Sequence, residues 1–234
     1  MEETYNIQAI VLGRQYFRES DSKITVYSLE KGRLELVARG TKKISSKLAG
    51  HLEPIGFVKI MVVRGKRFDY VGGVVSENSF QKIKNDLDKI KSAGEAINIF
   101  LKLIKEEEKN LDIYNLIKSF FEILNKKDFS NNDFLVSSFL LKLSVYLGYS
   151  PELFNCVICK EKIQPNGNRF SISKGGMVCK NCQAKDSLTI SDNSIKIIRF
   201  IINNNLDKII KIKTIKQQIS EIKNIVDLFV GFQT

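Results

Sequence analysis

The fold of the second half of this chain depends on two cysteine pairs, Cys156-Val-Ile-Cys159 and Cys179-Lys-Asn-Cys182. Nineteen residues separate the pairs, and the chain has no other cysteine. Each Cys-X-X-Cys turn can present two thiolates to one tetrahedral ion, a spacing typical of structural Zn²⁺ sites. We therefore expect one structural Zn²⁺ bound by Cys156, Cys159, Cys179 and Cys182, with no coordination position left open for catalysis.

The residues between the cysteine pairs favour a zinc-ribbon module. Phe170-Ser-Ile-Ser173 has the pattern of a short strand, and Gly175-Gly176 follows it as a tight turn. The alternative is a pair of disulfides in a secreted protein. It is disfavoured, because the acidic start Met1-Glu-Glu-Thr4 is not a signal peptide and a chain of 234 residues can bury a core without disulfides.

Composition indicates a globular protein with a polyanionic partner. The chain is 43% hydrophobic and 27% charged, and no apolar run reaches the roughly 18 residues of a membrane span. We expect it in the reducing cytoplasm, associated with the nucleoid and not with a membrane. The net charge is +11, and residues 31–67 alone hold 10 basic and 2 acidic side chains. A local excess of this size favours nucleic acid as the partner.

The first 80 residues predict a small β-barrel. Five short runs alternate apolar and polar residues and are rich in β-branched and aromatic side chains. The expected strands are residues 5–12, 23–29, 34–39, 56–63 and 68–75. Gly13 to Asp21 is polar and indicates a turn, and Gly32 is available for a hairpin turn. Such a run of strands is typical of the five-stranded oligonucleotide-binding (OB) fold.

Basic side chains of this region form a candidate phosphate-binding patch. The segment from Arg39 to Pro54 carries three lysines with hydroxyl side chains among them, and both chemistries can donate to phosphates. The candidates from charge are Arg33, Arg39, Lys42, Lys43, Lys47, Arg64, Lys66 and Arg67. Possible base-stacking aromatics are Tyr16, Phe17, Tyr27, Phe57, Phe68 and Tyr70, of which we expect Phe57 in the core.

The rest of the chain is predicted to be mostly helical. Apolar residues recur at helical spacing from Ser79 to Leu147, in a segment that is nearly neutral, and again after Ser191. The expected class is thus α+β, with a central helical bundle and a Cys₄ module inserted before C-terminal helices. The expected domains are the OB fold at 1–80, the helical domain at 81–150, the zinc module at 151–187 and C-terminal helices at 188–234, packed on the helical domain.

No residue group indicates catalysis. The sequence has no phosphate-binding GxxxxGK[ST] loop, and no dinucleotide fingerprint follows a strand. Its single histidine, His51, excludes most histidine-based chemistry. We therefore expect a binding protein and not an enzyme.

Several segments resemble the RecO family of bacterial recombination mediators. They are Ala9 to Asp21, Gly32, Ala38 to Gly50 and Leu52-Glu-Pro54, followed by Phe170, Gly175-Gly176 and Cys179-Lys-Asn-Cys182. The resemblance spans nearly the whole chain in the right order. One departure is Lys160, which follows the second cysteine where a glycine is common in the family.

The resemblance implies an OB fold, a helical middle and a zinc module. It implies binding of single- and double-stranded DNA, annealing of complementary strands, and loading of RecA onto SSB-coated single strands together with RecR, in the pathway of RecF. Its DNA-contacting positions would be Arg14, Arg39, Lys42, Lys43 and Lys47.

Two other classes stay open at this point. One is a zinc-ribbon factor of transcription or translation that binds nucleic acid without annealing it. The other is a scaffold whose zinc module and helices dock proteins. A nuclease is disfavoured, because no carboxylate cluster is visible in the sequence.

Overall fold

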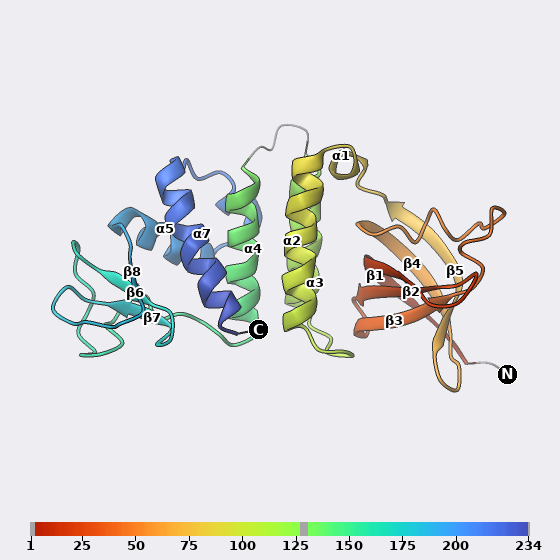
Figure 1. Cartoon of the computed structure of the whole chain (residues 1–234), viewed down its shortest axis with the longest axis horizontal. Coiled ribbons are helices and arrows are strands. Elements are labelled where there is room, and N and C mark those ends of the chain that lie inside the picture. Colours follow the sequence, from red (N-terminus) through yellow and green to blue (C-terminus); the bar gives the residue numbers. More distant parts are fainter. Residues whose placement is uncertain (1–2, 127–130, 234) are drawn as a thin grey trace. The chain divides into compact units, whose positions relative to one another are not determined.

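The structure, a computed structural model, describes residues 3–126 and 131–233. Its elements fall into two units, Met1–Ala93 with Ile104–Lys127, and Gly94–Leu103 with Asp128–Thr234 (Figure 1). The first unit holds β1 (Thr4–Tyr16), β2 (Ser22–Ser28), β3 (Gly32–Ala38), β4 (Gly56–Val63), β5 (Asp69–Asn78), α1 (Gln81–Lys84), the start of α2 (Leu87–Leu103) and α3 (Leu111–Leu124). The second holds the rest of α2, α4 (Asn132–Tyr146), β6 (Arg169–Ser171), β7 (Gly176–Val178), β8 (Ser187–Thr189), α5 (Asp192–Asn203), α6 (Leu206–Ile209) and α7 (Lys216–Gly231).

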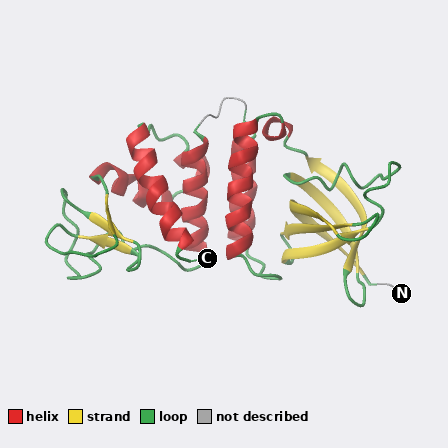
Figure 2. Cartoon of the chain, in the orientation of Figure 1, coloured by secondary structure: helices red, strands yellow, loops and turns green. Residues whose placement is uncertain are grey.

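The five N-terminal strands form a closed barrel in the order β1-β2-β3-β5-β4. Strands are drawn in yellow in Figure 2. The long strand β1 makes this closure possible, because it pairs with β4 from Thr4 onward and with β2 as far as Tyr16. A parallel pairing of β3 with β5, at Leu36 and Val37, closes the other side. Strand number and order confirm the predicted OB fold.

The barrel interior follows the predicted period of two. Alternate residues of β1, β2, β3 and β4 enter one buried cluster, because successive residues of a strand point to opposite faces, whereas β5 contributes Val71. The interior residues include Ile7, Ala9, Val11, Ile24, Val26, Leu34, Leu36, Val58, Ile60, Val62 and Val71, with Leu52 from the β3–β4 connection. Gly32 has a φ of 70°, and a Cβ there would lie 2.2 Å from the carbonyl oxygen of Glu108. The predicted glycine turn is therefore confirmed.

One prediction in this region is wrong. Gly13 to Tyr16 were expected in a turn, but they continue β1 and pair with Ser22 to Thr25 of β2. The register shifts between Val11 and Gly13, which marks a β-bulge. A bulge bends a strand without ending it, so polar residues after it can stay in the sheet. The turn is therefore shorter than predicted.

A second apolar cluster joins the barrel to α1 and α3 within the first unit. Phe57 of β4, expected in the core, is buried, and its ring centroid lies 6.0 Å from those of Phe80 and Tyr114. Phe80 in turn lies 5.8 Å from Phe121 of α3. The two pairs of Phe57 are edge to face, a geometry that adds to the stabilisation from burial alone. The helices therefore cover one side of the barrel, and the loops described below remain exposed.

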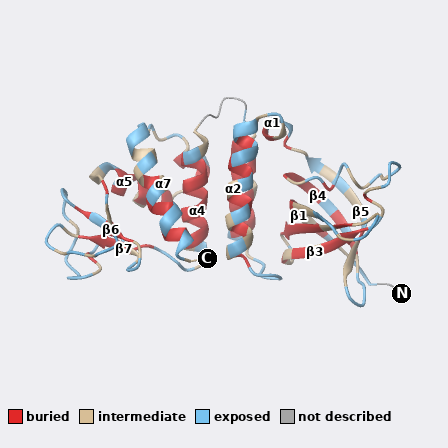
Figure 3. Ribbon diagram, in the orientation of Figure 1, coloured by how far each residue is buried: buried red, intermediate tan, exposed pale blue. Residues whose placement is uncertain are grey.

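The second unit is built round α4. Residues 134–144 of this helix are all buried, which places buried residues on every side of it, so it is a core helix and not an amphipathic one. Buried residues are red in Figure 3. Lys142 of α4 donates to the carbonyl oxygens of Ile201 and Ile202 at 3.4 and 3.3 Å, near the end of α5. A cation suits a helix C-terminus, although burial lowers the pKa of this lysine.

The cysteine-bearing segment forms a small antiparallel sheet, ordered β7-β6-β8. Phe170 of β6 meets Phe229 of α7 edge to face, with ring centroids 5.9 Å apart. Glu221 of α7 accepts hydrogen bonds from Ser191 and Ser194 at the start of α5. The predicted strand at Phe170 is confirmed, and the segment is packed on the C-terminal helices.

These observations confirm the predicted α+β class, with an N-terminal five-stranded barrel, helices after it and a four-cysteine module before the C-terminal helices. The domain boundaries given above stay a prediction, while the two units separate within α2, after Ala93. In the described part of the chain, no helix is long and apolar enough to cross a membrane.

The N-terminus of α3 offers a test of the fold. The Asn110 side chain accepts hydrogen bonds from the backbone N–H groups of Asp112 and Ile113, at 2.9 and 3.2 Å. Asn110→Ala should lower the free energy of unfolding by about 1 kcal/mol, measured by urea denaturation. Asn205 stands at the same position of α6 without a side-chain cap. Asn205→Ala is therefore the control, and an equal loss in both variants would contradict the capping role.

Candidate nucleic-acid interface and cysteine cluster

Three loops of the barrel come together at one surface. The Lys42 N–H donates to the carbonyl oxygen of Ser20 at 3.1 Å, and the Gly40 N–H donates to the Asp21 carboxylate at 2.9 Å. The rings of Phe17 and Phe68 meet edge to face, with centroids 5.2 Å apart. We call residues 16–21, 39–55 and 64–70 the loop surface. In OB folds the loops of this region flank the ligand.

Cations lie over aromatic rings throughout the loop surface. The pairs are Lys42 over Tyr16 at 3.7 Å, Arg39 over Tyr70 at 4.1 Å, Arg18 over Phe17 at 5.1 Å and Arg67 over Phe68 at 5.6 Å. A guanidinium that stacks by its face keeps its N–H groups in the plane, free to donate to phosphate oxygens. Aromatic rings also offer faces for bases. The arrangement can therefore bind both parts of a nucleotide.

Arg14 has a different role from the exposed cations. Its guanidinium donates to the carbonyl oxygens of Thr41 and Ala49, each at 3.2 Å, to the Ser22 hydroxyl at 3.3 Å, and to Glu53 at 2.7 Å. Its side chain is 19% exposed. These acceptors belong to the protein, so Arg14 holds the β3–β4 connection in place. That role is compatible with a DNA surface built on the connection.

The other predicted cations differ in their surroundings. Lys43, Lys47, Lys66 and Arg67 are exposed. Arg64 is also exposed and forms an ion pair with Glu3 at 3.5 Å, whereas Arg33 donates to the carbonyl oxygen of Ile104 at 3.0 Å. The structure thus gathers the candidates of the loop surface and leaves Arg33 beside the α2–α3 connection. Arg18 was missed, although its position next to Phe17 could have indicated it.

The predicted stacking aromatics also divide into two groups. Tyr16 is 87% exposed, while Phe17, Phe68 and Tyr70 are half-buried. Tyr27 is fully buried, and Phe57 belongs to the core described above. The aromatic side chains that a base could reach are therefore those of the loop surface.

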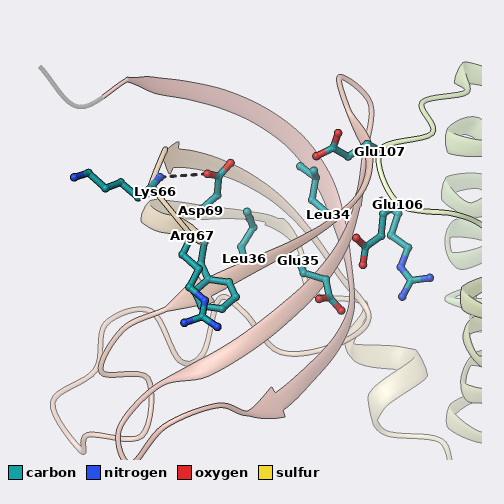
Figure 4. A pocket seen from close by; sticks show the side chains of 11 residues that line it. Leu34, Glu35, Leu36, Lys66, Arg67, Asp69, Glu106 and Glu107 are labelled. Atoms are coloured by element: carbon teal, nitrogen blue, oxygen red, sulfur yellow. Dashed lines mark hydrogen bonds between the residues drawn. The ribbon is translucent and has the colours of Figure 1, made fainter.

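A polar pocket of about 360 Å³ lies between β3, the β4–β5 turn and the α2–α3 connection. Lys66 and Arg67 lie on one side of it, and Glu35, Glu106 and Glu107 lie on the other (Figure 4). Because carboxylates repel phosphates, this acidic side sets a limit to a DNA-binding surface. The basic side belongs to the loop surface, which includes residues 64–70.

The four cysteines form a compact cluster in the second unit. Their Sγ atoms lie within 4.8 Å of one another, and those of Cys159 and Cys179 are 3.8 Å apart. Four sulfurs bound at about 2.3 Å to a tetrahedral ion are separated by about 3.8 Å. The cysteines are free thiols and not disulfides. The donor set and its spacing therefore fit a metal ion.

The electrostatics of the cluster also favour a cation. Burial opposes ionisation of Cys156, but backbone N–H groups, first that of Cys179, donate to its sulfur and lower its pKa to about 6. Burial and the surrounding sulfurs raise the pKa of Cys182 to about 12. Four thiolates cannot share so small a space without a compensating charge. A divalent cation would supply it.

The backbone of the first cysteine turn shows why glycine is common at the position of Lys160. Its N–H donates to the carbonyl oxygen of Cys156 at 2.9 Å, and its φ is 64°. That is the left-handed region, which glycine adopts without strain and other residues disfavour. The lysine therefore stands where the turn itself favours glycine.

Fold and site together define a class: an OB-fold protein with a basic, aromatic loop surface and a helical C-terminal part that carries a four-cysteine cluster. Two family models match the chain, "Recombination protein O N terminal" over residues 1–80 and "Recombination protein O C terminal" over residues 84–234. The chain belongs to the RecO family of DNA repair and recombination proteins. Membership gives it a role in DNA repair.

Similar proteins from several bacteria carry the name DNA repair protein RecO. That of Desulforamulus reducens is 28% identical over 211 residues, which is 89% of this chain and 81% of the relative. That of Dehalococcoides mccartyi is 28% identical over 220 residues, 94% of this chain and 86% of the relative. That of Clostridium perfringens is 25% identical over 222 residues, 95% and 89% of the two chains.

The strained turn at Lys160 gives a testable prediction. Lys160→Gly should raise the free energy of unfolding by up to about 1 kcal/mol, because glycine adopts the left-handed conformation without strain. The greater flexibility of glycine in the unfolded chain offsets only part of this gain. Lys162, two residues on, pairs with Asn155 in an isolated bridge. Lys162→Gly should lower the free energy of unfolding in the same urea titration. Destabilisation by Lys160→Gly would contradict the assignment of strain.

Proposed function

We propose that this protein binds single- and double-stranded DNA through the loop surface and anneals complementary strands. With RecR, it helps to load RecA onto single strands coated with SSB. The role is non-enzymatic: binding energy and charge neutralisation carry it. RecF is an indirect partner in the same pathway, and a cytoplasmic, nucleoid-associated location belongs with this role.

The observation that carries the proposal is the set of cation–ring pairs on the loop surface. Cations from three loops can neutralise the phosphates of a bound strand, while ring faces and guanidinium faces stack on its bases. Two complementary strands repel each other through their phosphates. A surface that neutralises both lowers this repulsion, so that pairing can begin.

One structural Zn²⁺ bound by Cys156, Cys159, Cys179 and Cys182 is part of the same proposal. The sulfur spacing and the need for a compensating charge support it. With four protein ligands the ion has no open position, so it would stabilise the module without taking part in chemistry. DNA binding by the barrel should not depend on it.

The test of the function is an annealing assay. Two complementary labelled oligonucleotides, bare or coated with the cognate SSB, are mixed with the full-length protein at two salt concentrations. We expect salt-sensitive acceleration that survives SSB coating. Binding without acceleration would instead favour the zinc-ribbon factor, and no binding at low salt would favour the scaffold.

The salt dependence of single-strand binding locates the surface. Lys43→Gln with Lys47→Gln should reduce the slope of log affinity against log salt by about 1.4, since each neutralised phosphate contributes about 0.7. The control is Lys82→Gln with Lys91→Gln, which changes the net charge equally at exposed positions in and near α2. Equal slopes in both double variants would contradict the assignment of these two lysines to the DNA surface.

Metal content tests the cysteine cluster. Native mass spectrometry of the wild-type protein should show one zinc ion per chain, and Cys179→Ser with Cys182→Ser should show none. Asn181→Ser, within the same turn but without a sulfur ligand, should keep the ion. Single-strand affinity should stay within about threefold in the zinc-free variant, a change of at most about 0.65 kcal/mol, because the proposed DNA surface lies on the barrel. Full zinc occupancy after loss of two cysteines would refute the ligand set.

A further inference from the structure

Ile44 is an apolar side chain that the fold leaves without cover. Its relative exposure is 108%, higher than that of any other large apolar side chain in the described residues. It lies at the tip of the β3–β4 connection, between Lys43 and Ser45. An exposed isoleucine alone needs no explanation. Its setting, however, distinguishes it from other exposed apolar side chains such as Leu87 on α2.

The loop that carries Ile44 is held in shape. The Lys43 N–H donates to the carbonyl oxygen of Gly40 at 3.1 Å, and the Ser46 N–H donates to that of Lys43 at 2.9 Å. The buried Thr41 hydroxyl donates to the Ser22 hydroxyl at 2.8 Å, and Arg14 binds the carbonyl oxygens on both sides of the tip. The apolar tip therefore stands on an ordered base, and little conformational freedom is lost when it binds.

The residues around Ile44 favour a ligand that carries negative charges beside an apolar interior. Lys42, Lys43 and Lys47 flank it, and no acidic residue occurs from Arg39 to Leu52. Stacked nucleic-acid bases offer this combination, because an apolar interior lies directly between rows of phosphates. Proteins insert isoleucine and similar wedges between base steps, and thereby unstack and kink the DNA.

We propose that Ile44 inserts between neighbouring bases of bound DNA and unstacks one base step, while the flanking lysines bind the adjacent phosphates. The inference rests on the proposed DNA binding and adds how the protein contacts the bases. An unstacked base exposes its pairing edge, so insertion would help a second strand to start pairing. An anionic lipid surface is the less favoured occupant, since stable anchoring needs more apolar contact than one isoleucine provides.

The experiment uses the full-length protein and oligonucleotides that carry 2-aminopurine, whose fluorescence rises when it unstacks. At saturating protein, single-stranded and duplex probes should brighten with the wild type, because insertion opens one base step. Ile44→Ala should lose more than half of this rise and keep the slope of log affinity against log salt. Lys43→Gln with Lys47→Gln should do the reverse, with a lower slope and the full rise at saturation.

Leu87→Ala is the matched control, because Leu87 is 80% exposed on α2. It should leave both the slope and the rise unchanged. A full fluorescence rise in Ile44→Ala would overturn the proposed insertion of Ile44. So would a second outcome, in which the DNA probes do not brighten but binding to phosphatidylglycerol vesicles depends on Ile44. If the wild type binds neither probe at low salt, the proposed DNA binding itself fails. That outcome is distinct from a wild type that binds without brightening the probe, which overturns only the insertion of Ile44.

Discussion

One guanidinium gives the basic connection of the barrel its shape. Arg14 leaves the end of β1 and donates to Thr41 and Ala49, at two points of the β3–β4 connection, and to Glu53 near its end. A connection of this length would otherwise sample many conformations at a large cost in entropy when it bound a ligand. Because Arg14 donates to the carbonyl oxygens of Thr41 and Ala49, it fixes the backbone on both sides of the lysines that lie between them.

This arrangement depends in turn on the bulge in β1. The shift of register after Val11 lets the strand continue to Tyr16, which brings Arg14 level with Ile24 of β2. The same extension places Tyr16 beside Lys42, and the short turn that remains places Phe17 against Phe68. Local backbone geometry thus determines which cations and rings share one surface. In the cysteine cluster, each Cys-X-X-Cys spacing brings two sulfurs together, and backbone hydrogen bonds such as that from the Val157 N–H to the Met177 carbonyl oxygen join the two turns.

Much of the fold follows from patterns within single elements. Alternation along β2, β3 and β4 predicts the barrel interior, and the two Cys-X-X-Cys turns predict their own convergence. Such patterns do not predict features that depend on contacts between residues far apart in the sequence. The sequence after Gly13 resembles a turn because it is polar. It forms a strand because it pairs with β2 after the bulge, and the local sequence does not show that pairing. Ile55 adopts a φ of 60°, unfavourable for a β-branched residue, where its N–H donates to Val11.

The candidate site divides in the same way. Charge alone selects Lys43, Lys47, Lys66 and Arg67, which the structure leaves exposed. It cannot show that the donors of Arg14, which the family resemblance selects, are used within the protein. It also overlooks Arg18, because Glu19 and Asp21 mask it in a count of charges. Ile44 carries no charge or motif, and only its complete exposure on an ordered basic loop identifies it.

Hydrogen–deuterium exchange of the full-length chain, with and without a single-stranded oligonucleotide, tests the location of the DNA surface most directly. If the loops of the barrel bind DNA, amide protection should appear in residues 16–21, 39–47 and 64–70 and should weaken as salt is raised. Protection confined to the cysteine-bearing segment or to the C-terminal helices, with these three loops unchanged, would contradict it.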